Sequence, residues 1–388
     1  MRLAFISYIP VGLCALALNC LSACRDPGST GSRLDVSAVA HTPVKRQSIG
    51  NCWLYAQSSW LESLLSTTEE RAVDVSESFW TYWDLYHKLL QGNEAGDEEG
   101  TINTGGSWGW SRWILQNYGW VEEADFIPLE DGVELSDAQL CAEVYLKTEA
   151  KAGGSLDPAV PRTPALVRAE LDKAFSCHGR FAVSMEETLK KVHSARETPL
   201  VDAAGHEHTL FDWLNAWSEV QSPGYDAWSR YEGKKLPPLA TLAQYAVLEG
   251  RIKRALNEHQ PVVLTLFVTF EAPNSEGVFN LNTLATRGSL GRTGGHMIVL
   301  HDYTVAGVPG RGDIGEGDLS AEDKQAALEG ELQYLVAKNS WGKDRQDRPW
   351  IKNGYSRFTW DYLTHTYFDE KQQLNWPFLQ SVIFPPGY

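Results

Sequence analysis

The chain has 388 residues, 43% of them hydrophobic and 11% aromatic, which is enough to build the core of one large domain or of two lobes. This composition excludes a chain that is disordered throughout. The formal net charge of −16 argues against nucleic acid and anionic membrane surfaces as binding partners, because both require concentrated Lys and Arg. We therefore expect an acidic globular protein without a nucleic-acid partner.

The first 23 residues have the pattern of an export signal. Arg2 precedes a nearly uncharged apolar run from Leu3 to Leu21. The run ends in Leu21-Ser22-Ala23-Cys24, which resembles the lipobox of bacterial lipoproteins, whose cysteine becomes the lipidated first residue. Residues 24–44, rich in Gly and Ser near their start, are expected to be a flexible tether. The sequence predicts a lipid anchor on Cys24 at a membrane of the bacterial cell envelope; ordinary secretion or an uncleaved anchor is the alternative.

The cysteine count singles out one thiol. Of six cysteines, Cys14 and Cys20 fall in the expected signal and Cys24 is the expected lipidation site. The remaining three permit one disulfide in an oxidising compartment, between Cys141 and Cys177, and leave Cys52 as the odd thiol.

Helical periodicity dominates residues 45–128, which we expect to form a helical lobe. Apolar side chains recur at helical spacing over 53–65, so Cys52 stands where that helix begins. Asp74, with Glu77 three residues later, indicates the start of a second helix. A third helix is predicted over 107–120, and Gly119 ends it. The tryptophans dense in this region are interpreted as core packing; an aromatic ligand platform is the alternative.

The rest of the chain divides into a helical insertion, 129–245, and a β-rich lobe, 246–388. Helices are predicted over 135–150, 209–220 and 248–260, and strands over 261–273, 296–305 and 332–341. The expected fold class is α+β, with a helical N-terminal lobe and a β-rich C-terminal lobe.

Three residues have the chemistry required of a thiol nucleophile, its base and a group that orients the base. A helix N-terminus favours the thiolate, so the position of Cys52 predicts a lowered thiol pKa. His296 follows Gly295 at the start of an apolar strand, where a small residue permits a close approach of the backbone. Asn339 ends another apolar strand, where its amide can orient the imidazole, and Trp341 can shield that pair from water.

These residues occur in three short motifs whose order resembles that of papain-like cysteine peptidases. The local motifs are most similar to the bleomycin hydrolase and aminopeptidase C branch of that family, which also carries a helical insertion. The resemblance implies the two-lobed papain-like fold. The motifs are Gln47 with Cys52-Trp53, Gly295-His296-Met297 and Asn339-Ser340-Trp341-Gly342.

The resemblance also implies roles for the residues. Cys52 would be the nucleophile, His296 the general base and then acid, and Asn339 the residue that orients the imidazole. Gln47 would share the oxyanion hole with the backbone N–H of Cys52. Gln47 stands five residues before the cysteine, whereas the family usually has six, so its turn is one residue shorter. Trp53, Trp341 and Gly295 would support the site.

The expected function is hydrolysis of peptide bonds in peptide or protein substrates through a thiol acyl-enzyme, without a cofactor or metal. Endopeptidase and aminopeptidase activity are both open. The alternatives are a catalytically inactive papain-like binding protein, or a transpeptidase or amidase that uses the same residues. Two polar stretches are expected to be loops rather than metal sites. The first contains Asp313, Glu316 and Asp318 and lacks the bidentate glutamate of an EF-hand. The second contains His206 and His208.

Overall fold

The computed structural model describes residues 41–96, 102–202, 205–224, 239–317, 319–369 and 374–388. The chain divides into two units, Met1–Arg33 and Leu34–Tyr388, and every described residue lies in the second. The expected signal, the lipidation site Cys24 and most of the tether lie outside the described residues. None of the described helices has the length and hydrophobicity needed to cross a membrane.

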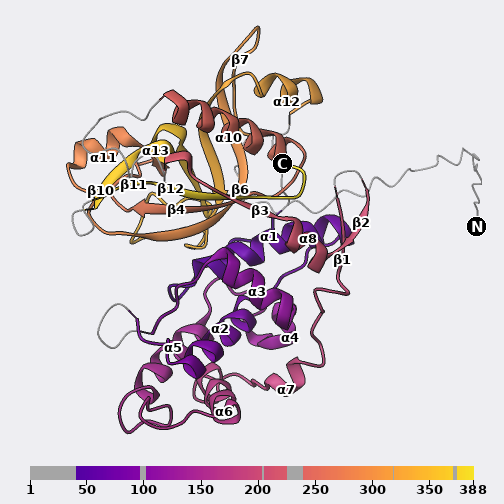
Figure 1. The fold of residues 1–388 in the computed structure, drawn as a ribbon, viewed down its shortest axis with the longest axis vertical. Helices are drawn as coiled ribbons and strands as arrows, with labels where there is room; N and C mark the ends of the chain where they lie inside the picture. The colour runs from indigo at the N-terminus through magenta and orange to yellow at the C-terminus, as the bar shows by residue number, and fades with distance from the viewer. Residues whose placement is uncertain (1–40, 97–101, 203–204, 225–238, 318, 370–373) are drawn as a thin grey trace, which may run out of the picture. The chain divides into compact units, whose positions relative to one another are not determined.

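Three long helices form the helical part of the fold: α1 (Cys52–Glu69), α2 (Glu77–Gln91) and α3 (Trp108–Tyr118), shown in Figure 1. Helix α2 begins after Ser76, whose Oγ accepts from the backbone N–H of Phe79, and not at the expected Asp74. Helix α3 ends at Gly119, as predicted, where φ is +69°.

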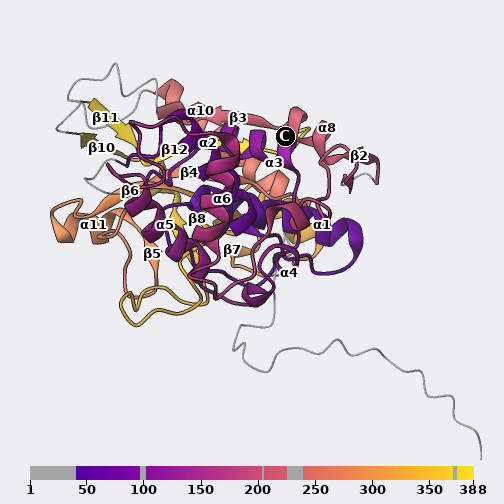
Figure 2. The same cartoon turned by 90° about the horizontal axis from the view of Figure 1, so that it is seen from below.

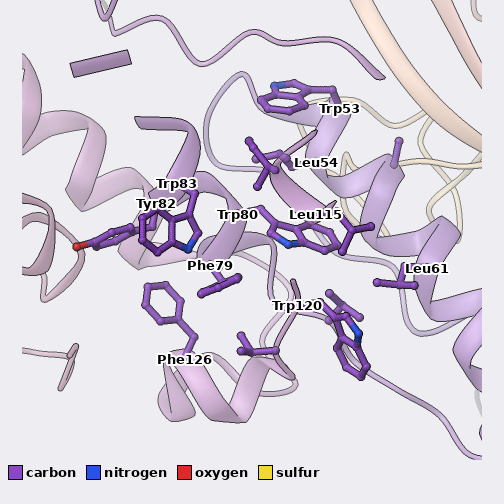
Figure 3. Close-up of a cluster of buried hydrophobic side chains, with 14 of the residues drawn as sticks. Trp53, Leu54, Leu61, Phe79, Trp80, Tyr82, Trp83, Leu115, Trp120 and Phe126 are labelled. Atoms are coloured by element: carbon purple, nitrogen blue, oxygen red, sulfur yellow. The ribbon is translucent and has the colours of Figure 1, made fainter. Parts of the chain in front are cut away.

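Most of the tryptophans between residues 53 and 120 are buried in this helical part, as expected. Figure 3 shows four of them, Trp53, Trp80, Trp83 and Trp120, among the other apolar side chains of this core. Trp80 and Trp120 are 0% and 1% exposed. Trp80 and Trp120 each donate their indole N–H, to the Gly119 carbonyl at 2.8 Å and to Thr198 Oγ1 at 3.0 Å. Tryptophan thus supplies large buried area here without leaving those two polar nitrogens unsatisfied.

Shorter elements follow in the region expected to be a helical insertion. Helices α5 and α6 pack against each other, and a disulfide joins Cys141 of α5 to Cys177 just after α6, with 5.2 Å between Cα atoms. Two short elements begin before residue 129, α4 (Glu123–Phe126) and η1 (Pro128–Glu130); after them come α5 (Asp137–Glu149), α6 (Pro164–Phe175), α7 (Met185–Thr188), β1 (Pro199–Val201), β2 (Glu207–Thr209), α8 (Leu210–Ala216) and β3 (Ser218–Gln221).

The helix predicted over 209–220 is wrong in its second half. Helix α8 ends at Ala216, because Trp217 turns to extended backbone (ψ 140°) and packs against Trp60 with ring centroids 4.9 Å apart. The following residues form β3, an edge strand paired with β12. Tertiary packing has therefore overridden a local helical pattern.

The β-rich part is built on an eight-stranded sheet. Its order is β3-β12-β4-β6-β8-β9-β5, β7 pairs with β6, and only the β5–β9 pairing is parallel. In both views the hairpin of β10 and β11 lies at the far end of this part from α1 and α8 (Figures 1 and 2). The strands are β4 (Val263–Thr269), β5 (Val278–Phe279), β6 (Thr293–Val308), β7 (Gly312–Ile314), β8 (Glu331–Lys338), β9 (Tyr355–Thr359), β10 (Thr366–Asp369), β11 (Leu374–Pro377) and β12 (Leu379–Phe384).

Helix α10 (Leu239–Asn257) packs across the sheet and closes a second core with it. Within the described residues the further helices are α11 (Leu281–Arg287), α12 (Ala321–Ala327) and α13 (Trp360–Thr364). Helix α1 contacts strand β6, so the two cores meet along the helix that begins with Cys52. Helices in one part and a largely antiparallel sheet in the other confirm the expected α+β class.

Candidate active site

Cys52 is the first residue of α1 and the only free cysteine in the described part of the chain. The preceding Asn51 does not cap the helix with its side chain, which instead donates to Thr81 Oγ1 and Gln139 Oε1, both at 2.9 Å. The backbone N–H of Met297, on strand β6, lies within hydrogen-bond reach of the Cys52 sulfur. The thiol is therefore placed beside the residue that follows His296.

The thiol pKa does not follow the prediction from the helix N-terminus. Burial raises the pKa of Cys52 to about 11, and the hydrogen bonds from the backbone N–H groups of Met297 and Trp53 only oppose that effect. The cost of moving a thiolate out of water exceeds the stabilisation that the helix start and these N–H groups provide. Cys52 is thus a thiol at neutral pH in this structure.

His296 and Asn339, predicted from separate motifs, are hydrogen-bonded to each other. His296 Nε2 lies 2.8 Å from Asn339 Oδ1. That oxygen also accepts from the backbone N–H of Ser340 at 2.8 Å, while Asn339 Nδ2 donates to Ser356 Oγ at 2.9 Å. Because the amide is fixed with its oxygen toward the imidazole, Nε2 carries the proton and Nδ1 keeps its lone pair.

Trp341 covers the imidazole, as the sequence suggested. The two rings are stacked with centroids 4.5 Å apart and an interplanar angle of 17°, and His296 is 6% exposed. Burial lowers the pKa of His296 to about 4; the hydrogen bond to Asn339 raises it, and the nearby Arg348 lowers it further. The imidazole is therefore neutral at pH 7 and can accept a proton at Nδ1.

The glycines before His296 have a different function from the one expected. A Cβ placed on Gly294 or Gly295 would meet no atom within 4 Å among the described residues. The strand thus does not require glycine for close backbone approach. The absence of side chains instead leaves open space directly before the histidine.

Gln47 lies beside the Asn339 segment, but its amide is largely occupied. Its Oε1 accepts from Ser340 Oγ at 2.6 Å, and its Nε2 donates to the Ile49 carbonyl at 2.8 Å. The backbone N–H of Gln47 also donates to the Ser340 carbonyl at 2.9 Å. One of the two Nε2 hydrogens remains for another acceptor.

Trp53, next to the cysteine, is anchored on a segment that follows α2. Its indole N–H donates to the Thr104 carbonyl at 2.9 Å, and the side chain is 2% exposed. A Cβ on Gly106 would lie 2.3 Å from the Trp53 ring, so glycine is required there by close contact. The adjacent Gly105 carbonyl accepts from Lys88 Nζ at 2.7 Å.

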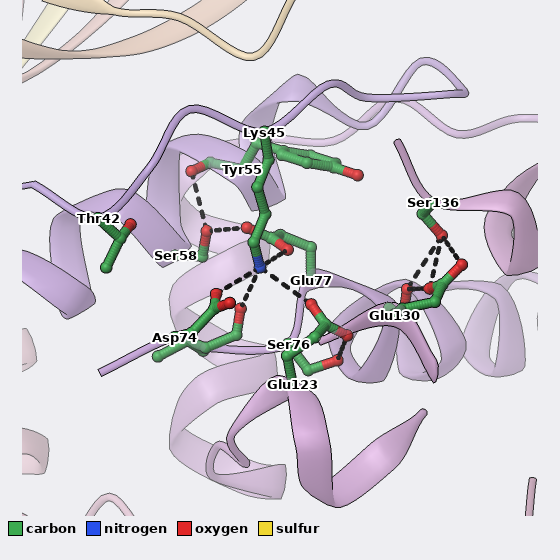
Figure 4. A network of polar contacts seen from close by, with 12 residues as sticks. Thr42, Lys45, Tyr55, Ser58, Asp74, Ser76, Glu77, Glu123, Glu130 and Ser136 are labelled. Carbon is green, nitrogen blue, oxygen red and sulfur yellow. Dashed lines mark hydrogen bonds and ion pairs between the residues drawn. The ribbon is translucent and has the colours of Figure 1, made fainter. Parts of the chain in front are cut away.

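A buried network of charged side chains lies behind the site, and the sequence analysis missed it. Lys45 Nζ is 2.6 Å from Asp74, 2.8 Å from Glu77 and 2.9 Å from Glu123, as Figure 4 shows. Asp74 and Glu77 were linked only as a helix-start signal, and Lys45 and Glu123 are too far from them in the sequence for a local pattern to connect all four. The available sequence signal was the occurrence of charged residues among apolar ones in 74–88.

A second buried ion pair joins the cysteine helix to the asparagine strand. Lys338, the residue before Asn339, has its Nζ 3.5 Å from Glu62 Oε2 on α1 and 2.9 Å from Thr42 Oγ1. A cavity of about 10 Å³, enough for about one water molecule, lies between the two ion-pair groups. Its lining includes Lys45, Glu77, Met297, Lys338 and Asn339.

The two stretches considered for metals show no metal site. Glu316 is paired with Arg357 at 2.5 Å, and Asp318 lies outside the described residues. His206 Nδ1 and His208 Nε2 each lie 3.1 Å from Asp202 Oδ2. Within the described ranges, no group of three or more His, Cys, Asp or Glu side chains is arranged to hold a metal ion.

The chain is similar to solved structures of several other proteins. No family model matches the chain, and no curated protein matches it. Among solved structures, PepW from Lactobacillus rhamnosis HN001 has a TM-score of 0.41 and 12% identity, over 92% of this chain and 82% of that chain. The digestive procathepsin L 3 of the Tenebrio molitor larval midgut has a TM-score of 0.39 and 15% identity, over 91% and 68%.

Xylellain, a cysteine protease from Xylella fastidiosa, has a TM-score of 0.38 and 11% identity, over 92% of this chain and 86% of that chain. With TM-scores and identities this low, the likenesses support no step of the functional argument. That argument rests on the residues and contacts of this chain.

Proposed function

We propose that the protein is a papain-like cysteine peptidase that hydrolyses peptide bonds through a thiol acyl-enzyme. The observation that carries the proposal is the meeting of three separate motifs at one point. Helix α1, which begins with Cys52, packs against strand β6 near Met297, and the adjacent His296 is held by Asn339 at 2.8 Å with Nδ1 left as the proton acceptor. Nucleophile, base and orienting group are the parts this chemistry requires.

The proposed reaction begins from a neutral thiol and a neutral imidazole. Cys52 Sγ attacks the carbonyl carbon of the scissile bond while His296 Nδ1 takes the thiol proton. The backbone N–H of Cys52 donates to the developing oxyanion, with the remaining Nε2 hydrogen of Gln47 as the second donor. His296 then gives its proton to the leaving amine as the carbon–nitrogen bond breaks, and water hydrolyses the thioester to release the acid.

The hydrogen bond to Asn339 supports both proton transfers. The imidazolium formed in the attack is stabilised by Asn339 Oδ1, which accepts from Nε2–H throughout. Trp341 excludes water from one face of the imidazole, so this hydrogen bond acts in a medium of low dielectric constant. Open space before His296, at Gly294 and Gly295, is where a peptide can approach.

Loss of the nucleophile tests the proposal. Cys52→Ala is expected to abolish hydrolysis of a peptide library that the wild-type protein cleaves. Cys141→Ala combined with Cys177→Ala is the matched control, because it removes the disulfide-bonded cysteines and keeps Cys52. Undiminished cleavage by Cys52→Ala would contradict the assignment of the nucleophile.

We also propose that the mature protein is tethered to the bacterial cell envelope by a lipid on Cys24. The lipobox-like Leu21-Ser22-Ala23-Cys24 and the Gly- and Ser-containing residues after it support this proposal. Metabolic labelling with an alkyne fatty acid is expected to mark the wild-type protein and not Cys24→Ala. Labelling of both proteins, or of neither, would contradict the anchor.

A binding protein without hydrolytic activity is the second candidate, and two observations favour it. Burial raises the pKa of Cys52 to about 11, and the Gln47 amide is already bonded to Ser340 and Ile49. In that case peptides would bind to the wild-type protein and be recovered intact. Transpeptidation or amide hydrolysis by the same residues would instead appear as acyl transfer to an added amine or as release of ammonia.

A further inference from the structure

Arginine side chains gather around the tryptophan that stacks on His296. The guanidinium carbon of Arg348 lies 5.9 Å from the centroid of the Trp341 ring and 4.6 Å from that of Phe270. Arg292 approaches the same Phe270 ring to 4.6 Å, and the Phe270 and Trp341 centroids are 5.4 Å apart. Two guanidinium groups are thus held by aromatic faces next to the site.

Arg292 and Arg348, with the neighbouring Arg46, Arg345 and Asp347, are called the arginine cluster below. The cluster contains four positive side chains and one negative one. Burial lowers the pKa of Arg348, and repulsion by Arg345, Arg292 and Arg46 lowers it further, while Asp347 raises it. Asp347 Oδ1 accepts from Arg345 Nε at 2.8 Å, whereas Asp347 Oδ2 lies 4.0 Å from Arg348 Nε. Asp347 is therefore paired mainly with Arg345. Among the described residues, neither Arg292 nor Arg46 has an ion-pair partner.

The cluster contrasts with the acidity of the rest of the chain, whose formal net charge is −16. Acidic residues on the adjoining segments are already engaged. Glu134 Oε1 accepts from the backbone N–H of Lys343 at 3.2 Å, and Glu271 Oε2 lies 3.8 Å from Arg287 Nε. The bond to a neutral N–H leaves the charge of Glu134 in place, so the positive charge that an anion meets is that of Arg292 and Arg348 themselves, which the aromatic rings hold in position.

The arginine cluster lies on the leaving-group side of the scissile bond because it lies beside the imidazole that protonates the leaving group. In the proposed reaction His296 protonates the leaving amine, so that amine and the residues after it lie beside the imidazole. Trp341 covers the imidazole, and Arg348 lies over the Trp341 ring. The guanidinium is consequently within about 10 Å of the imidazole, which is the reach of about three extended residues.

We propose that Arg348 and Arg292 bind a carboxylate carried by the leaving-group part of the substrate, within three residues of the scissile bond. The guanidinium group binds carboxylates through paired hydrogen bonds, and an aromatic face beneath it keeps it oriented. The carboxylate has two possible sources: an Asp or Glu side chain, or the carboxyl terminus of a short peptide. This substrate preference rests on the proposed peptidase function.

Four matched peptides test the preference and identify its source. They carry Asp or Asn at the second residue after the scissile bond, each with a free or an amidated carboxyl terminus. Wild-type protein is expected to cleave a carboxylate-bearing peptide with a kcat/KM at least about fivefold above its neutral counterpart, since hydrogen bonds between charged groups are worth more than about 1 kcal/mol. The Asp/Asn comparison reports the side chain, and the free/amidated comparison reports the terminus.

Variants connect the preference to the cluster. In the double variant Arg292→Gln, Arg348→Gln, the kcat/KM of the carboxylate peptide is expected to exceed that of the neutral peptide by less than about twofold. In wild type the same ratio of kcat/KM values should fall with added salt. Arg196→Gln is the matched control, because this exposed arginine lies over the Phe211 ring at 3.7 Å outside the cluster. Equal cleavage of all four peptides by wild type, or a preference that survives in the double variant, would overturn the proposal.

A binding measurement separates this inference from the peptidase function. Fluorescence anisotropy with Cys52→Ala is expected to show at least about fivefold tighter binding of the preferred carboxylate peptide than of its neutral counterpart. If no peptide is cleaved but this difference persists, the carboxylate site stands and the peptidase function fails. If peptides are cleaved without such a difference in rate or binding, the peptidase function stands and the carboxylate site fails; if neither is seen, both fail.

Discussion

Removing the amide of Asn339 takes away the hydrogen bond that orients the His296 imidazole. Asn339 is 4% exposed, and its Oδ1 accepts from His296 Nε2 at 2.8 Å. Asn339→Ala leaves that buried N–H without its partner, which costs about 1–3 kcal/mol. The substitution also frees the proton to move to Nδ1, the nitrogen that must accept the thiol proton.

We therefore predict that Asn339→Ala lowers kcat/KM about 10- to 100-fold, since each 1.4 kcal/mol corresponds to about a factor of ten. Most of the loss should be in kcat, measured with a neutral peptide between pH 3 and 9 so that the acid limb set by His296 is included. Asn339→Asp keeps the acceptor and adds a negative charge, so it raises the pKa of His296 above about 4. The pH below which kcat/KM falls should consequently be higher for Asn339→Asp than for wild type.

Asn257→Ala is the matched control for Asn339→Ala. Asn257 makes two side-chain hydrogen bonds away from the site, to the Lys324 carbonyl at 2.9 Å and from the Tyr303 hydroxyl at 2.7 Å. Its loss should lower the melting temperature and leave kcat/KM unchanged. The reasoning fails if Asn339→Ala loses stability to a similar extent and still keeps kcat/KM within about twofold of wild type.

Three further predictions concern the thiol, the buried ion pair and the tryptophan contact. Alkylation of Cys52 by iodoacetamide should be slow at pH 7 and rise about tenfold per pH unit toward about pH 11, because only the thiolate reacts. Lys338→Met leaves Glu62 buried without its cation, so denaturant titration should show a loss of about 3–5 kcal/mol in unfolding free energy. Gly106→Ala forces a methyl group into the Trp53 ring, so thermal melting should show a loss of about 1–3 kcal/mol.

Each of these predictions has its own control. A reaction rate that is already constant below pH 8 would mean that the thiolate exists in the resting protein. Adding Glu62→Gln to Lys338→Met should recover much of the lost stability, and no recovery would contradict the ion-pair argument. Gly105→Ala is the control for Gly106→Ala, since the nearest atom to its Cβ would be 3.6 Å away, and equal losses would contradict the steric argument.

The parts of the candidate site that the sequence predicted lie at ends of elements that leave a local signal. Cys52 opens a helix with clear apolar periodicity, and Asn339 closes a strand of apolar residues. His296 lies near the start of the longest strand, β6. Sequence order then sufficed to propose that the three residues meet.

The features that sequence could not provide depend on contacts between distant segments. Glu62 and Lys338 are far apart in the chain and pair only because α1 packs against the sheet. The same packing partly buries Cys52 and reverses the direction of the pKa shift that the helix start alone predicts. β3 was predicted as helix because its sequence carries no sign of its partner β12, which lies more than 150 residues later.

Trapping the nucleophile tests the central claim most directly. Wild-type protein treated with a thiol-directed peptidyl epoxide should gain the mass of one inhibitor, located on Cys52 by peptide mapping. Hydrolysis should disappear in proportion to that modification, and His296→Ala should be modified far more slowly. Full peptide hydrolysis by protein that is completely modified at Cys52, or an active protein that the epoxide never modifies there, would contradict the claim.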